Sequence, residues 1–414
     1  MILRGGLIVA AFIALLGPFA GRAAAVSRQV NCPAGVPPVF STIQAAVDAS
    51  CSGDTISVVG TCNEPVTINT QNAGCTGGAV AFTKLSINGS SSASNNNTGA
   101  GPAFLITGNA RNITINNITV GSLASHGIQV VSAHRVTLQS IRTAPSSFPG
   151  AVALLDGINI DTASTRVRVL SSTLNNNGGD GVENGSTDGE LTSVTANDNE
   201  LIGIHVPGSQ AMVTRCKAND TPAGNVQDEG FRFDGPGAIV QQCTAKDNAV
   251  AQFRDTAAST GVIHFRNVAG NSSATTVPAG AGIGFWEEGS GNRINTCSAF
   301  KNASHGVHLA GNGNALQLST ISSNVGDQVS VTGDNNLLQE NVITRVSAPN
   351  VFVSTTPAVN APAGATANFF DRNRVSVASS SVTGDGFTVA DPDNNGQQNT
   401  RSPGDPLDPP ANLR

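Results

Sequence analysis

One short pattern recurs along most of the chain and limits what it can fold into. Its clearest copies are ITINNITV, LTSVTAND, VTRCKAND, VQQCTAKD, INTCSAFK and LQLSTISS, at residues 113–120, 191–198, 213–220, 240–247, 294–301 and 316–323. The fourth position of the pattern recurs 22 residues apart in two runs, which are Ser172, Val194 and Cys216, then Cys297, Ser319 and Asn341. A repeat of this length without a helical period indicates a solenoid, in which each strand pairs with its copy in the next coil.

A second signal follows the first within each coil. Its copies are HGIQV, DGINI, DGVEN, GIHV, GFRF and HGVHL, at residues 126–130, 156–160, 180–184, 203–206, 230–233 and 305–309. Apolar and other residues alternate there, so one side chain points into the coil and the next points out. Three short strands per coil without a helix predict an all-β parallel solenoid of roughly a dozen coils, covering residues 85–389.

Two columns of identical residues follow from this alignment. Cys216, Cys243 and Cys297 share the reference position, with Val268 expected in the coil between the last two. We expect a ladder of buried thiols and no metal there, because no histidine or carboxylate shares the column. A column of asparagines, expected to hydrogen-bond along one turn and to tolerate left-handed backbone, comprises Asn177, Asn199, Asn248, Asn302 and Asn324.

The two ends differ from the repeats. Residues 1–25 combine Arg4, an apolar run and a small-residue triplet, which predicts a signal peptide and an exported protein. Residues 26–84 are expected to form an N-terminal cap and the first coils, with a capping helix in FSTIQAAVDAS, residues 40–50. Residues 390–414 hold five prolines without apolar rhythm and are expected to be disordered.

Composition limits the partners. The formal net charge is −6, and −8 without residues 1–25, so nucleic acid is not expected as a partner. No segment after residue 25 is apolar enough to span a membrane. We expect a monomer, secreted to the periplasm or the exterior. Disulfides are expected to cross-link the first fifth of the chain, among Cys32, Cys51, Cys62 and Cys75. Three alternative pairings of these four cysteines stay open.

The segment STIQAAVDASCSGDTISVVGTCNEPVTI, residues 41–68, resembles the start of pectin-lyase-like proteins. The resemblance implies a right-handed parallel β-helix built of such repeats, with any polysaccharide groove on the first-strand face beside inserted loops. Residues 143–155, 218–229 and 269–281 hold insertions at that junction. Asp54 and Glu64, in the resembling segment, are expected to be structural. The signatures of pectate lyases, polygalacturonases, pectin methylesterases and alginate epimerases are absent, which argues against each of those activities.

Charged residues gather on the expected outward column of the first strand. The predicted column is Gln129, Asn159, Glu183, His205, Arg232, Arg254, Gly284, His308 and Ser330. Such faces usually carry small polar residues, so Glu183, His205, Arg232, Arg254 and His308 are candidate catalytic residues. Candidates for contacting the substrate are Asn159, Asp161, Asp234, Trp286 and Glu287.

One hypothesis is the processing of a polyuronate as a lyase, epimerase or hydrolase. Arg232 and Arg254 would hold the uronate carboxylate, and His205 or His308 would transfer the proton. Glu183 would orient His205, and Trp286 would stack on a sugar. The alternative is a non-catalytic surface or matrix protein whose unlike charges neutralise one another along the ladder. No cofactor is identified, and clustered carboxylates leave Ca²⁺ open without a spaced ligand motif.

Overall fold

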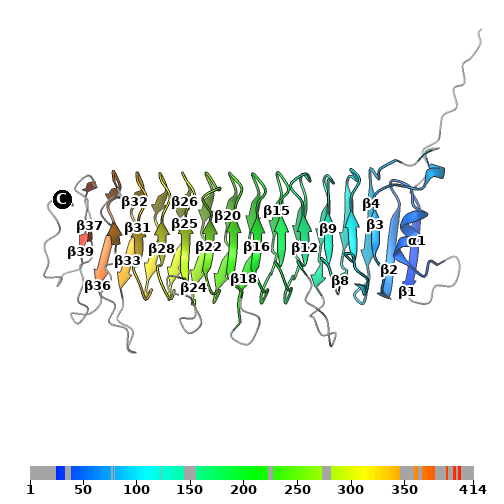
Figure 1. Ribbon diagram of the computed structural model, residues 1–414, viewed down its shortest axis with the longest axis horizontal. Helices are drawn as coiled ribbons and strands as arrows, with labels where there is room; N and C mark the ends of the chain where they lie inside the picture. The colour runs from blue at the N-terminus through cyan, green and yellow to red at the C-terminus, as the bar shows by residue number, and fades with distance from the viewer. Residues whose placement is uncertain are drawn as a thin grey trace, which may run out of the picture.

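The chain winds into a stack of parallel coils along one long axis (Figure 1). The computed structural model describes residues 25–32, 39–75, 78, 80–122, 124–143, 155–221, 227–272, 281–345, 359–361, 366–377, 388–389, 395–397 and 400–401. The predicted signal peptide lies outside these residues except for Ala25. No helix among the described residues is long and apolar enough to cross a membrane.

Sheet 1 is the face formed by the second sequence signal, and its strands pair in parallel from coil to coil. Its strands in the described chain are β3 Val66–Ile68, β6 Phe104–Ile106, β9 Ile128–Val130, β12 Ile158–Ile160, β14 Val182–Asn184, β16 Ile202–Val206, β19 Glu229–Phe233, β22 Ala251–Asp255, β25 Ile283–Glu287, β28 Val307–Leu309, β31 Val329–Val331, β34 Val359–Ala361 and β37 Thr388–Val389.

Sheet 2 follows sheet 1 along the chain within each coil. Its strands in the described chain are β1 Ser27–Cys32, β2 Thr55–Cys62, β4 Leu85–Gly89, β7 Ile113–Asn116, β10 Thr137–Gln139, β13 Arg168–Leu170, β15 Glu190–Thr192, β17 Met212–Thr214, β20 Ile239–Gln241, β23 Ile263–Phe265, β26 Arg293–Asn295, β29 Ala315–Gln317, β32 Leu337–Gln339, β35 Phe369–Asp371 and β38 Asn395–Gln397.

Sheet 3 closes each coil, and its first strands join sheet 2 through the long strand β2. Its strands in the described chain are β5 Ser94–Asn97, β8 Thr119–Ser122, β11 Arg142–Thr143, β18 Lys217–Asn219, β21 Thr244–Lys246, β24 Val268–Gly270, β27 Ser298–Phe300, β30 Thr320–Ser322, β33 Val342–Arg345, β36 Arg374–Val377 and β39 Thr400–Arg401. The all-β parallel solenoid predicted from the repeat is therefore confirmed.

The glycine that opens the second signal is required by the close approach of neighbouring coils. A Cβ added to Gly181 would lie 2.6 Å from the carbonyl oxygen of Gly203, in the next coil. The same contact, also 2.6 Å, joins Gly157 to Gly181. The strand that follows each glycine alternates buried and partly exposed residues, which fixes the register because a slip of one residue would turn the apolar set outward.

The cysteine column lies inside the coils as predicted, with one correction. Cys216, Cys243 and Cys297 are buried and unpaired. The coil between the last two contributes Asn267 and not Val268, because Thr244 pairs with Val268 and places the preceding residue in the column. The Asn267 side chain accepts a hydrogen bond from the backbone N–H of Cys243 at 2.9 Å, so a polar residue is satisfied there by the preceding coil.

The asparagine column hydrogen-bonds along the axis as predicted. Nδ2 of Asn177 donates to Oδ1 of Asn199 at 2.7 Å, and Nδ2 of Asn302 donates to Oδ1 of Asn324 at 2.8 Å. The left-handed conformation lies one residue earlier than expected, for example at Asn176 with φ 57°. The buried asparagine therefore stabilises the turn through its side chain, while its neighbour supplies the backbone bend.

The helix α1 Ile43–Asp48 forms inside the segment predicted to be helical. The Thr42 side chain accepts a hydrogen bond from the N–H of Ala45, and the Glu64 carboxylate accepts from the N–H groups of Ile43 and Gln44. Carboxylates at a helix N-terminus satisfy donors that have no partner within the helix. Glu64 is thus a structural residue, as expected, and Figure 1 shows α1 beside β1 and β2 at one end of the solenoid.

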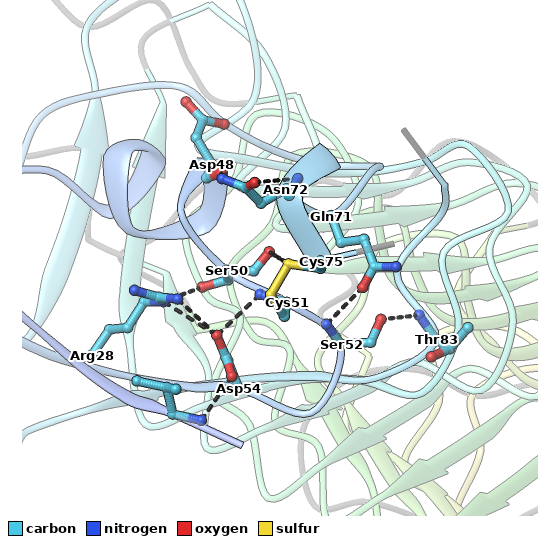
Figure 2. Close-up of a disulfide and its surroundings, with 12 residues drawn as sticks. Arg28, Asp48, Ser50, Cys51, Ser52, Asp54, Gln71, Asn72, Cys75 and Thr83 are labelled. Carbon is cyan, nitrogen blue, oxygen red and sulfur yellow. Dashed lines mark hydrogen bonds and ion pairs between the residues drawn. A yellow bond between two sulfur atoms is a disulfide. The ribbon is translucent and has the colours of Figure 1, made fainter. Parts of the chain in front are cut away.

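Two disulfides hold this end together. The pairs are Cys32–Cys62 and Cys51–Cys75, which settles the three alternatives. Figure 2 shows Asp54 beside the second pair, where its carboxylate binds Arg28 and accepts from the N–H of Cys51 at 3.0 Å. Asp54 is only 1% exposed, so its charge is compensated by these donors and serves the cap.

The ladders continue into the segment predicted to be a disordered tail. β38 pairs in parallel with β35, and β39 pairs with β36. These residues are strand and not irregular chain, because pairing with the preceding coil uses backbone groups and needs no apolar rhythm in the sequence. The rest of residues 390–414 lies outside the described residues.

Candidate functional site

The charged column predicted on sheet 1 exists and faces outward. Register places Glu183 beside His205, His205 beside Arg232, and Arg232 beside Arg254 in successive coils. Each of these side chains is partly exposed, while the residues on either side of it are buried. Adjacent coils lie about 4.8 Å apart in such a ladder, so four ionisable groups share a short stretch of one face.

The next member of the column is Trp286 and not Gly284. Arg254 pairs with Trp286, which in turn pairs with His308. Gly284 lies on the inner side, where an added Cβ would be 2.3 Å from the carbonyl oxygen of Gly306. The prediction was wrong here because the sequence GIGF offers two glycines, and the second one is equivalent to the glycines of the other coils.

His205 is held between two carboxylates. Its Nδ1 lies 3.2 Å from Oδ2 of Asp180, and its Nε2 lies 2.8 Å from Oδ2 of Asp234. Burial alone would lower the pKa of His205, but the hydrogen bonds and charges of the two aspartates raise it to about 9. His205 is therefore a fixed imidazolium at neutral pH, with both N–H groups committed to protein carboxylates.

Asp234 forms the centre of this network. Although burial opposes the shift, hydrogen bonds from His205, Thr256 and Arg232 lower the pKa of Asp234. Its Oδ1 accepts from Nε of Arg232 at 3.1 Å and from the Thr256 hydroxyl at 2.7 Å. Its position beside the column agrees with the prediction, but its carboxylate is occupied by protein donors.

Glu183 does not orient His205, which was the role predicted for it. Its Oε2 accepts a hydrogen bond from Nδ2 of Asn159 at 2.7 Å, and Asp180 and Asp234 orient the imidazole. Burial raises the pKa of Glu183. A carboxylate with a raised pKa is a stronger base than an ordinary one, so Glu183 is the group of the column best placed to accept a proton.

The two arginines of the column differ. Arg254 donates from Nη1 to Glu229 at 2.7 Å and from Nε to Glu288 at 2.9 Å. Arg232 contacts only Asp234 through Nε, and no other ion pair or hydrogen bond of its guanidinium occurs within the described parts of the chain. The terminal nitrogens of Arg232 are therefore available to a ligand, whereas Arg254 is already neutralised by the protein.

The indole of Trp286, predicted to stack on a sugar, contacts its neighbours in the column. The guanidinium carbon of Arg254 lies 4.4 Å from the centre of the indole. On the other side the His308 ring lies 6.2 Å away at an interplanar angle of 10°. Residues of the two neighbouring coils thus contact the indole, which stays partly exposed. Burial, with His305 beside it, lowers the pKa of His308 to about 4, so His308 is a neutral and weakly basic group.

Two predicted contact residues serve the fold instead. Asp161 accepts hydrogen bonds from the N–H of Ser132 and from the N–H and hydroxyl of Ser164, in the turn after β12. Glu287 points into the solenoid and is 1% exposed. It follows the outward Trp286 in the strand, and alternation places it inside, so it cannot contact a ligand on sheet 1.

Glu287 belongs to a buried cluster that sequence reasoning missed. In the preceding coil Asp255 pairs with Glu287 and also points inward. Nε2 of His264 lies 3.1 Å from Oδ1 of Asp255. The His264 ring meets three phenylalanine rings edge to face, at 5.6 Å from each. The register alone would have placed Asp255 and Glu287 inside, because they follow the outward residues Arg254 and Trp286.

A calcium ion does not fit the carboxylates of the column. Ligand atoms of Asp180, Glu183 and His205 lie within 4.8 Å of one another. Calcium takes six to eight oxygen ligands, whereas this group includes an imidazolium whose two N–H groups are both used. The arrangement is that of a hydrogen-bonded charge network.

The inserted loops predicted to wall this face lie largely outside the described residues, which leave out 144–154, 222–226 and 273–280. Their anchors are described. Each connects a strand of sheet 3 to the next strand of sheet 1, for example β18 to β19. The insertions therefore enter and leave at the edge of the face that carries the charged column.

Comparisons with known proteins agree with the fold. The family described as right handed beta helix region matches residues 156–343. The mannuronan C-5 epimerase AlgE6 A-module of Azotobacter vinelandii is similar with a TM-score of 0.53 and 14% identity, over 88% of this chain and 95% of that one. Tailspike protein 3 of bacteriophage CBA120 is similar with a TM-score of 0.52 and 9% identity, over 85% of this chain and 57% of that one. No curated protein sequence matches.

The stacked coils, the three parallel sheets and these similarities define a class of fold. The chain folds as a right-handed parallel β-helix. At identities this low the similarity to solved structures concerns the fold, and function has to be argued from the site.

Proposed function

We propose that the face of sheet 1 around Arg232 binds an acidic polysaccharide and that the protein processes it there. The observation that carries the proposal is the arrangement of three adjacent coils. A carboxylate with a raised pKa, a fixed imidazolium and an arginine with free terminal nitrogens occupy successive positions, which are Glu183, His205 and Arg232. Arginine binds carboxylates through two parallel hydrogen bonds, so Arg232 would hold a uronate carboxyl group.

The chemistry that fits is β-elimination next to the uronate carboxyl. Glu183 would take the proton from the carbon that bears the carboxyl group, and Arg232 would stabilise the enolate that forms. The electron pair then forms a carbon–carbon double bond as the bond to the glycosidic oxygen breaks. The leaving oxygen would receive the proton from Glu183. His205 would keep the neighbouring aspartates from repelling the substrate.

Export of the protein belongs to the same proposal. The predicted signal peptide and the pairs Cys32–Cys62 and Cys51–Cys75 support it, because disulfides persist in oxidising compartments. The AlgE6 module and the tailspike are proteins of the same fold with similar overall shape. A polymer outside the cytoplasm is the substrate class that such a location would supply.

The test uses full-length protein and a panel of polyuronates, including polymannuronate and polygalacturonate. Binding is measured by calorimetry, and elimination by the ultraviolet absorption of the unsaturated product. We expect Arg232→Ala to abolish binding, and Glu183→Gln to abolish product formation while binding persists. Arg168→Ala is the matched control, since Arg168 also has one carboxylate partner through Nε but lies on sheet 2. Full polyuronate binding by Arg232→Ala would refute the proposal.

A second candidate is a non-catalytic surface rod, and one observation favours it. Most charges of the column are paired within the protein, as Arg254 is by Glu229 and Glu288. A column that neutralises itself stabilises the stack without needing a ligand. Wild-type protein that binds no member of the panel would favour this function.

A further inference from the structure

A pocket lined by basic side chains lies away from the sheet 1 column, at the turn between sheets 1 and 2. Its volume is about 290 Å³, and it is lined by Arg111, Asn112, His134, Arg135, Thr165 and Arg166. These residues belong to three successive coils, because Arg111 bridges to His134 and His134 bridges to Thr165. The whole chain has only 22 lysines and arginines and a net charge of −6, so three arginines and a histidine around one pocket are a strong local excess.

The charges of this pocket are largely uncompensated. The side chains of Arg111 and Arg135 make no hydrogen bond or ion pair within the part of the chain that the structure describes. Arg166 has one contact, at 3.6 Å between its Nε and Oδ2 of Asp188, and both side chains are about half exposed. Exposed pairs of this kind contribute little free energy and exchange easily for a ligand. No acidic residue lines the pocket.

Neighbouring groups hold the lining in place. Nδ1 of His134 lies 2.9 Å from the Thr165 hydroxyl, which orients the imidazole. Asp161, an acid in the same turn as Thr165 and Arg166, is engaged by the N–H of Ser132 and by Ser164. Its carboxylate is therefore saturated by donors of the turn and does not neutralise the arginines.

The position of two arginines is unusual for the fold. Arg135 and Arg166 have φ 56°, in a left-handed turn position that recurs in every coil. Register shows that other coils hold smaller residues at this position, which are Asn112, Asp188, Gln210, Gly237, Asn335 and Ala367. Two consecutive coils thus carry arginine where the backbone favours a smaller residue, and both guanidinium groups reach the same pocket.

We propose that this pocket binds a doubly charged oxyanion, a phosphate or a sulfate group. Three guanidinium groups and an imidazole offer converging N–H donors and a charge that one carboxylate would not balance. The volume suits a single small group, because ordinary ligand pockets start at about 300 Å³. The anion could be free in solution or an ester on a polysaccharide. This proposal does not depend on the sheet 1 site, whose residues begin at later coils.

The test titrates full-length protein with sodium sulfate and sodium phosphate at constant ionic strength, with sodium chloride as the reference anion. The variant is Arg111→Thr combined with Arg135→Asn and Arg166→Asn. Each replacement is the residue found in the same column of another coil, as in Thr165 and Asn112, so the variant should fold. We expect saturable binding by the wild type and at least about tenfold weaker binding by the variant. Arg215→Asn is the matched control, because Arg215 is an exposed arginine with φ 54° on another corner.

A polymer arm distinguishes the two sources of the anion. Dextran sulfate and unsulfated dextran are compared on the same three proteins. Tight binding of dextran sulfate that the triple variant loses supports an ester as the ligand, and binding of free sulfate alone supports a small anion. The proposal is overturned if neither sulfate nor phosphate nor dextran sulfate binds more tightly than chloride, or if the triple variant binds as the wild type does. Arg232→Ala should bind sulfate normally, so the result is independent of the polyuronate test.

Discussion

The replacement Asp255→Asn should stabilise the protein most at alkaline pH and clearly less at pH 5. The reason lies in where the buried cluster holds its protons. The Asn267 amide is fixed, since its Oδ1 accepts from the N–H of Cys243 and its Nδ2 donates to the carbonyl of Val240. That Nδ2 also lies 3.3 Å from Nδ1 of His264, which must therefore be the unprotonated nitrogen. His264 is a neutral donor to Asp255.

Two carboxylates consequently share the dry interior with a neutral imidazole. Oε1 of Glu287 is buried without a hydrogen-bond partner in the described chain. Burial raises the pKa of Asp255 to about 7 and also raises that of Glu287. Near neutral pH the pair therefore retains a proton between the two side chains, and losing it leaves two negative charges in an apolar core.

The magnitude follows from linkage. A carboxyl whose pKa is raised by folding contributes stability that is complete below its ordinary pKa and is lost as the pH rises through the folded pKa. For Asp255, a change from 3.8 to about 7 corresponds to about 4 kcal/mol, lost between about pH 4 and pH 7. Asparagine avoids this loss, because its Oδ1 can accept from His264 while its Nδ2 faces Oε1 of Glu287.

The assay is thermal unfolding followed by circular dichroism from pH 5 to pH 8.5, on the wild type and Asp255→Asn. We expect the Tm of the variant to exceed that of the wild type by about 2 °C at pH 5 and by about 5 °C at pH 8.5, given the unfolding entropy of a 414-residue chain. Asp188→Asn is the control, because the Asp188 side chain is 44% exposed. A variant with the same pH dependence as the wild type, or one less stable at pH 8.5, would refute the assignment of the proton.

Two further predictions concern the columns inside the coils. Cys243→Asp should cost more than about 4 kcal/mol of unfolding free energy, because Cys243 is 0% exposed and the new charge would have no partner; a melting curve equal to that of the wild type would contradict the inward position, and Cys243→Ala is the milder comparison. Asn302→Ala should cost about 0.5–1.5 kcal/mol by removing the hydrogen bond from its Nδ2 to Oδ1 of Asn324, measured by denaturant titration, and no loss would show that the ladder hydrogen bond contributes nothing.

The sequence predicts the coil well because two independent periodicities constrain it. The alternation within each strand decides which residues point inward, and the glycine before it decides which residues of neighbouring coils pair, as Gly181 and Gly203 do. Where a coil has one such glycine followed by the alternating strand, the predicted register is correct, as at His205 and Arg232. At residues 282–285 two glycines stand two apart, both alignments keep the alternation, and the pattern could not choose Trp286.

The candidate site was predicted less well, since its contacts are not set by the period. Arg254 is 25 residues from Glu229 and 34 from Glu288, because inserted turns carry these partners back to the column. Whether an arginine is paired or free then depends on side chains that the repeat does not describe. The inward position of Asp255 and Glu287 could have been derived from the register, but acidic residues were assumed to be outside.

Because the coils stack in register, the length of the solenoid can change by whole coils. Arg293 pairs with Ala315, and Ala315 pairs with Leu337, each one coil further along the axis. Excising residues 293–314 would join Asn292 to Ala315 and present every later strand to a partner of the same kind, including the asparagine turn that links Asn292 to Asn314 and then to Asn336. The rod would shorten by one step of about 4.8 Å. Groups on its surface can thus be brought closer or further apart in discrete increments without redesigning any interface.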